Sequence, residues 1–196
     1  MSVVDTQENI LHSFDNEELM ALARFDLDQG RVDQALAKIK KILQTDAGNA
    51  DTLSMGGKVY AQLRLFDKAK NCFKQFLEIK PDEVLERFQL GMVHFDSGDR
   101  EGALAIWNEL LEKQPTHPPA LFYKGLVLAQ QNKEADAKQC LSILLQSAPA
   151  DNLYFGRAKE LLQALDRGDN AKIADNSGSD SAAGNNKFLK DAYKIN

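Results

Sequence analysis

The chain has 196 residues, of which 43% are hydrophobic and 27% are charged, and its formal net charge is −5. This composition suits one packed domain with tails, and the acidic balance argues against a general nucleic-acid-binding protein, which usually carries a basic patch. No apolar run approaches the roughly 20 residues of a membrane-spanning helix, and the acidic first residues do not resemble a secretory signal. We therefore expect no nucleic-acid partner, no membrane span and a cytoplasmic location.

Residues 1–14 precede the regular part of the chain. If this segment is helical, Val3, Ile10, Leu11 and Phe14 fall on one side of it. Terminal segments are usually loose unless they dock, so a frayed end or a capping helix is one interpretation. The other interpretation is a helix that binds a partner or forms a homodimer through these four residues.

Residues 15–168 follow a 34-residue period. Small residues recur at this step in two series, which are Ala23, Gly57, Gly91 and Gly125, and Ala35, Ala69, Ala103 and Ala137. A fixed period of this length is typical of stacked pairs of helices. Small residues are expected where two helices cross closely, because a larger side chain would overpack the contact. Prolines recur at the same step after the second helices, which they end: Pro81, Pro115 and Pro149.

Taken in chain order, the period predicts four helix-turn-helix units and one further helix. The units cover about 16–49, 50–83, 84–117 and 118–151, and a capping helix covers 152–167. Residues 169–196 begin with Asn, Ser, Gly, Asp and Ala without periodicity, so we expect a flexible tail. The last ten residues are either a disordered end or a tethered peptide that docks through Phe188 and Tyr193.

The residues at set positions in the second unit carry a family resemblance. They are Leu53, Gly57, Tyr60, Ala69, Phe73 and Pro81. With them, Asp51 to Pro81 resembles the tetratricopeptide repeat, and the other three units match in part. The predicted fold class is therefore all-α, a right-handed α-solenoid of four such units with a C-terminal capping helix. The resemblance also implies that the first helices line a concave groove in which peptide partners bind.

The first helices of units three and four carry more apolar residues than packing within a unit needs. In unit three, Leu85, Phe88, Met92 and Phe95 form a second stripe at spacings of three, four and three. Unit four repeats this with Phe122 and Leu126. A helix that is apolar almost all round must be buried on more than one side. The stripe is therefore either a partner-binding surface or is covered by the chain itself, through the amino-terminal segment, the capping helix or the tail around Phe188.

The earlier part of the groove is polar. Arg24 and Lys58 are predicted to attract an acidic flank of the partner. One subset of the family that this chain resembles binds the acidic tails of heat-shock chaperones through lysine, arginine and asparagine residues at these groove positions. Because the asparagines are absent here and units three and four are apolar, that role is not favoured.

The sequence offers little for catalysis. His12, His94 and His117 are scattered and lack metal-ligand spacing, and the glycines form no phosphate loop. Cys72 and Cys140 lie two repeats apart, too far for a disulfide, so we expect buried thiols. We therefore predict no enzymatic activity, no catalytic residues, no metal and no cofactor.

The predicted function is protein binding without catalysis. The groove would hold an apolar peptide or helix with an acidic flank, as a scaffold or adaptor, or as an assembly or secretion co-chaperone. The alternative is a structural, self-associating protein whose groove binds its own terminal segment or a second copy.

Overall fold

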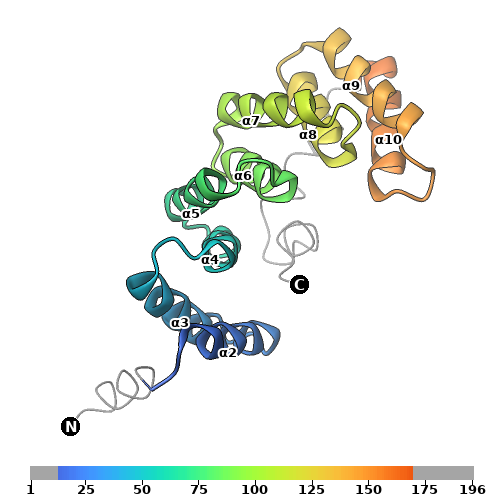
Figure 1. The fold of residues 1–196 in the computed structure, drawn as a ribbon. Helices are drawn as coiled ribbons and strands as arrows, with labels where there is room; N and C mark the ends of the chain where they lie inside the picture. Colours follow the sequence, from blue (N-terminus) through green and yellow to red (C-terminus); the bar gives the residue numbers. More distant parts are fainter. Residues whose placement is uncertain (1–12, 170–196) are drawn as a thin grey trace. The chain divides into compact units, whose positions relative to one another are not determined.

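The computed structural model describes residues 13–169, and all regular secondary structure in this range is α-helical (Figure 1). The helices are α2 (Asn16–Asp28), α3 (Val32–Thr45), α4 (Ala50–Gln62), α5 (Phe66–Ile79), α6 (Val84–Asp96), α7 (Arg100–Lys113), α8 (Pro118–Gln130), α9 (Glu134–Ser147) and α10 (Leu153–Arg167). Helix α2 packs on α3, α4 on α5, and α8 on α9, and α10 covers α8 and α9. The predicted all-α fold of repeated helical pairs is confirmed.

Two sets of predictions lie outside the described residues. The homodimer contacts proposed for Val3, Ile10 and Leu11 belong to residues 1–12, and the tail belongs almost entirely to residues 170–196. Phe14, the fourth residue of the apolar set, is half-buried just before α2.

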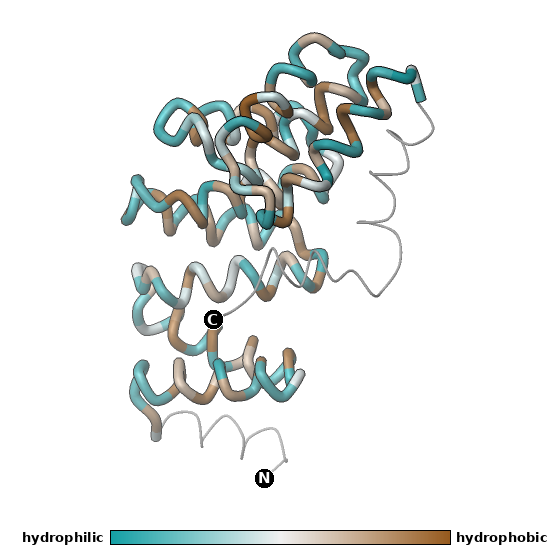
Figure 2. Tube along the Cα trace, turned by 90° about the vertical axis from the view of Figure 1, so that its right-hand side faces the viewer, coloured by the Kyte–Doolittle hydropathy of each residue, from teal (hydrophilic) through white to brown (hydrophobic). Residues whose placement is uncertain are grey.

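Local signals start and stop these helices. Asp15 caps α2, because its carboxylate accepts the backbone N–H of Glu18 at 2.8 Å, and the Glu18 carboxylate accepts the N–H of Asp15 at 2.9 Å. At the other end of the described chain, Gly168 ends α10 in the left-handed conformation with φ 68°. Polar and apolar residues alternate along the helices (Figure 2), so most helices bury one side and expose the other.

The periodic small residues mark the closest helix contacts. A Cβ atom on Gly91 would lie 2.6 Å from Cδ1 of Trp107, and one on Gly57 would lie 2.8 Å from the Phe73 ring. At Gly125 the nearest side chain is Leu141, at 3.2 Å. At Gly57 and Gly91 a larger side chain would overpack the crossing, as predicted, whereas at Gly125 the Leu141 side chain would have to give way by only a few tenths of an ångström.

The described residues divide between two compact units, and the boundary lies inside α6, between Glu86 and Arg87. Unit 1 contains a core cluster from its first two helical pairs, formed by Ala23, Ala35, Ile39, Met55 and Val59. In unit 2 the buried Trp107 ring has its centroid 5.8 Å from that of Tyr123 and 6.0 Å from that of Phe95. Each unit therefore has a core of its own.

Candidate functional site

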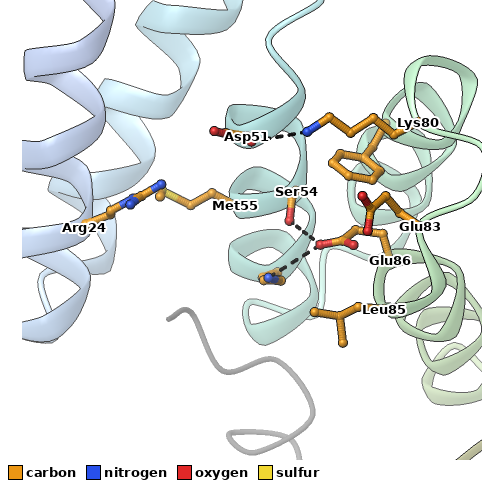
Figure 3. A pocket seen from close by; sticks show the side chains of 10 residues that line it. Arg24, Asp51, Ser54, Met55, Lys80, Glu83, Leu85 and Glu86 are labelled. Atoms are coloured by element: carbon orange, nitrogen blue, oxygen red, sulfur yellow. Dashed lines mark hydrogen bonds and ion pairs between the residues drawn. The ribbon is translucent and has the colours of Figure 1, made fainter.

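A pocket of about 330 Å³ lies in unit 1, where side chains of α2, α4 and the start of α6 come together (Figure 3). Charged and hydroxyl groups dominate its lining, among them Arg24, Ser54, Lys58, Lys80, Glu83 and Glu86. Its apolar contributions come from Met55, Phe76 and Leu85. The site is thus a polar pocket with apolar patches, on the side where the resemblance places a groove.

Glu86 forms the inner wall of this pocket. It is only 7% exposed, and its Oε1 accepts a hydrogen bond from the Ser54 hydroxyl at 2.8 Å. Lys58 Nζ lies 3.8 Å from the same oxygen, and the Lys58 side chain is 11% exposed. A buried charge is costly unless it is paired and hydrogen-bonded. The three residues therefore compensate one another and hold the wall in one arrangement (Figure 3).

Arg24 is placed differently. It lies on the exposed side of α2 and points toward α4 (Figure 3). Besides this pocket it lines an adjoining one of about 560 Å³, which Met20, Asp46 and Asn49 also line. None of the described residues gives the Arg24 side chain a hydrogen bond or an ion pair. Its guanidinium group therefore keeps all of its donors available between two pockets.

The rim carries a weaker pair. Lys80 Nζ lies 3.9 Å from Oδ1 of Asp51, and both side chains are exposed. Exposed pairs of this kind contribute about 0–1 kcal/mol at most. Lys80 and Asp51 can therefore exchange partners at little cost.

Three of the predicted site residues meet at this pocket. Arg24 and Lys58 line it, and Leu85 is 52% exposed at its edge. Lys58 differs from the prediction in one respect, because its ammonium group faces the buried Glu86 rather than open solvent.

The structure places the other five predicted binding residues in the core of unit 2. Phe88, Met92, Phe95, Phe122 and Leu126 are all buried. The Phe88 ring centroid lies 6.0 Å from that of Tyr123 and 5.5 Å from that of His117. Phe122 packs against Tyr154 of α10, at 5.6 Å. Within unit 2 the second apolar stripe is thus covered by the chain's own side chains: Tyr154 comes from the capping helix, one of the covers that the sequence left open, and Tyr123 and His117 come from α8 and its N-cap.

Sequence reasoning missed Glu86, although a signal for it was present. One repeat before and one repeat after it stand Thr52 and Ala120, and both are fully buried. The first repeat has the exposed Glu18 at this position, so a buried glutamate in the third repeat indicates a special local environment. Here that environment is the Ser54 hydroxyl and the Lys58 ammonium group.

The two cysteines are free and buried, as predicted. Burial raises the pKa of the Cys72 thiol to about 11 and also raises the pKa of Cys140. Neither is prepared as a nucleophile, which needs a lowered thiol pKa. Cys140 lies at a third pocket of about 420 Å³ on unit 2, beside Lys124 and Leu104.

Residues 13–169 contain no group of three or more acidic, histidine or cysteine side chains placed to hold a metal ion. In the same range, no helix has both the length and the apolar character needed to cross a membrane.

The repeat pattern is decisive for the family. Models of the tetratricopeptide repeat match residues 26–89 and residues 88–152, one after the other. The chain belongs to the tetratricopeptide repeat family. Members of this family use their repeats to bind other proteins, so the fold supports a protein-protein interaction module.

Known relatives agree with this fold. Cellulose synthase operon protein C of Pseudomonas fluorescens (strain SBW25) is 27% identical over 136 residues, which is 64% of this chain and 11% of that protein. The chain thus spans about a ninth of that relative's length. A crystal structure of MamA protein is similar with a TM-score of 0.71 and 19% identity, over 92% of this chain and 96% of MamA.

A second solved structure is YrrB, described as a tetratricopeptide repeat protein with an unusual peptide-binding site. Its TM-score is 0.64 at 19% identity, and the match covers 95% of this chain and 87% of YrrB. At these identities the structural matches show the fold alone.

Proposed function

We propose that this chain is a protein-binding module that holds a peptide segment of its partner across α2, α4 and the first turn of α6. The observation that carries the proposal is Arg24, an arginine without a partner among the described residues that lines two adjoining pockets. Arginine binds carboxylates through two parallel hydrogen bonds. The segment would therefore place an aspartate or glutamate at Arg24.

The apolar part of the segment would lie beside that contact. Leu85 is half exposed, and Met55 and Phe76 line the same pocket. This fits a peptide with one apolar side chain followed or preceded by an acidic one. Lys58 would contribute less to binding, because Glu86 already neutralises its charge.

This arrangement favours a scaffold or adaptor over a co-chaperone. A co-chaperone that shields an apolar segment needs a long exposed apolar groove, and the five residues predicted to supply it are buried. A pocket with a charged wall and a small apolar edge is better suited to recognising a short, specific motif. YrrB, with its peptide-binding site, shows that a similar fold can take a peptide.

The test selects peptides from a displayed random library on the full-length chain and measures their affinity by fluorescence polarisation. We expect an enrichment of acidic residues, and a loss of about tenfold to a hundredfold in affinity for Arg24→Ala, as for one charge-assisted contact. Lys74→Ala, at an exposed position of α5 that lines neither pocket, removes one positive charge from the same unit; it is the matched control and should leave affinity unchanged.

A charge exchange separates direct contact from a general effect of charge. Arg24→Glu should abolish binding of the selected peptide, and replacing the peptide's acidic residue by lysine should restore it to this variant. If the selected peptides show no acidic preference and bind the Arg24→Glu chain as well as the unmodified chain, the proposal is wrong.

A further inference from the structure

Glu86 has one carboxylate oxygen in use and one that is spare. Its Oε1 accepts the Ser54 hydroxyl at 2.8 Å and is the oxygen nearest to Lys58 Nζ, at 3.8 Å. Its Oε2 accepts no hydrogen bond from any described residue. Oε2 is also not one of the described polar atoms that are both sealed from solvent and without a partner, so it opens onto the pocket that Glu86 lines (Figure 3).

This spare oxygen is held in place before any ligand arrives. Glu86 is only 7% exposed, and the Ser54 hydrogen bond fixes its carboxylate. The other two carboxylates that line the pocket belong to exposed residues, Asp51 and Glu83. A buried oxygen gains more from accepting a hydrogen bond than one in water, because less water competes for it. A fixed acceptor also loses little freedom on binding, so Oε2 is the best-prepared acceptor of this pocket.

The charge beside Oε2 indicates which donor fits it. The Lys58 ammonium group lies near the other oxygen, its side chain is only 11% exposed, and it compensates the charge of Glu86. A second cation at Oε2 would lose its water next to Lys58 and be repelled by it. A neutral N–H satisfies Oε2 without adding a charge. The pocket wall therefore favours a neutral donor over an ammonium or guanidinium group.

A bound peptide segment carries such donors in its backbone. Helix α4, which contributes Ser54, lies between α2, which contributes Arg24, and the start of α6 (Figure 3). A segment that contacts both Arg24 and Leu85 therefore passes the wall that Glu86 forms. In an extended segment the direction of successive residues alternates. One backbone N–H can then face Oε2 while the neighbouring side chains reach other parts of the pocket.

We propose that Oε2 of Glu86 accepts one backbone N–H of the bound segment and so fixes which residue of the segment lies at Arg24. The inference rests on the peptide-binding function proposed above, and it adds a register and a forbidden residue to it. Proline has no backbone N–H. The segment therefore cannot carry proline at the residue that donates to Glu86.

Amide-to-ester substitution tests the proposal on the unmodified full-length chain. The probe is the tightest-binding peptide from the library selection, synthesised with an ester oxygen in place of one backbone N–H at a time. At one position the ester should lower the affinity, measured by fluorescence polarisation, by about tenfold to a hundredfold, as for a lost hydrogen bond to a charged group. Proline at that position should weaken binding at least as much, and esters at the flanking positions should change affinity much less.

Variants of Glu86 show whether this residue is the acceptor. In Glu86→Gln and in Glu86→Ala, checked for folding by circular dichroism, the sensitive ester and the amide peptide should bind within about twofold of each other. Glu83→Gln is the matched control, because it removes one carboxylate charge from an exposed residue of the same pocket. Whatever its effect on affinity, this variant should keep the full ester penalty.

Three results would overturn the proposal. If no single ester weakens binding while Arg24→Ala still does, the peptide-binding function stands and the register assignment is wrong. If the ester penalty is the same in Glu86→Gln as in the unmodified chain, another acceptor holds the segment. If the selected peptides carry a lysine or arginine at a fixed distance from the acidic residue, and Glu86→Gln weakens only these peptides, the donor is a cation. A selection without any acidic preference would instead contradict the proposed function itself, and this inference with it.

Discussion

Asp26 shows, at the level of one residue, how a departure from the repeat is accommodated. It stands where the next repeat has Tyr60, and it is buried. Lys38 Nζ donates to its Oδ2 at 2.5 Å, and Arg31 Nε donates to its Oδ1 at 2.9 Å. In the second repeat a tyrosine ring fills this place. In the first repeat the shorter aspartate is accompanied by two basic side chains, Lys38 from α3 and Arg31 from the turn before it.

These contacts make the stability of the protein depend on pH. Burial alone would raise the pKa of Asp26, but the hydrogen bonds and charges of Lys38 and Arg31 outweigh it, so the pKa lies below its usual range. The folded state then releases this proton more readily than the unfolded state, whose aspartates titrate near pH 4. The stabilisation is complete above that value and is lost as the pH falls through the lowered pKa.

We therefore predict that Asp26→Asn is less stable than the unmodified chain by about 1–3 kcal/mol at pH 7. The difference should shrink as the pH is lowered from 5 to below 3, because the unmodified carboxylate then becomes protonated. Urea unfolding of both chains at several pH values measures this difference and cancels the effects of all other carboxylates. A difference that stays constant with pH would contradict the assignment.

At the level of the helix, the starts of the second helices differ in one informative way. Asp99 precedes α7, and its carboxylate accepts the backbone N–H of Gly102 at 2.9 Å. The same carboxylate group lies 2.7 Å from Nδ1 of His94. The corresponding residues before α3, α5 and α9 are Arg31, Leu65 and Lys133, and none of them makes a side-chain cap.

The cap of α7 should be transferable to α5. Leu65 has φ −86° and ψ 64°, close to the φ −81° and ψ 78° of Asp99, and its side chain is exposed. In Leu65→Asp the carboxylate should accept the N–H of Lys68, and the positive end of the helix should favour it further. We expect a gain of about 0.5–1 kcal/mol over Leu65→Ala, which removes the leucine without adding a cap.

Urea unfolding at neutral pH measures this gain. High salt should reduce it only in part, because the hydrogen bond remains when the charge is screened. An aspartate variant no more stable than the alanine variant would show that the turn before α5 cannot form the cap.

The sequence predicted the helices well because the repeat constrains them at several positions at once. Residue 91 must be small for the Trp107 ring to fit. Pro81 follows the end of α5, because a proline cannot continue the hydrogen-bond pattern of a helix. Each unit supports the register of the next, so an error in one unit would conflict with the others.

The binding surface was harder to predict, because periodicity shows that a face is apolar but not what covers it. Phe88 and Phe122 have the pattern of a binding stripe, and the aromatic side chains Tyr123 and Tyr154 that fill it come from later helices. Glu86 was missed for the opposite reason. Its role in the pocket wall depends on the hydrogen bond that it accepts from Ser54, a residue 32 positions away in the sequence but adjacent in space.

For the molecule as a whole, the two compact units and the nearest-neighbour contacts of a repeat array indicate local rather than uniform stability. The single tryptophan of the sequence, Trp107, is fully buried in unit 2. Its fluorescence therefore reports the unfolding of unit 2, whereas far-ultraviolet circular dichroism reports all the helices. The two signals can distinguish the units without any label.

We predict that Ile39→Ala separates the two signals. Ile39 is fully buried in unit 1, and truncating it should cost about 2–5 kcal/mol of local stability. In urea, the circular dichroism curve should begin to fall at a lower concentration, while the midpoint of the Trp107 fluorescence moves much less. Leu141→Ala, equally buried in unit 2, is the control and should shift the fluorescence midpoint strongly. Coincident curves for Ile39→Ala would mean that both units unfold as one cooperative structure, because the coupling between repeats would then exceed the loss in the first unit.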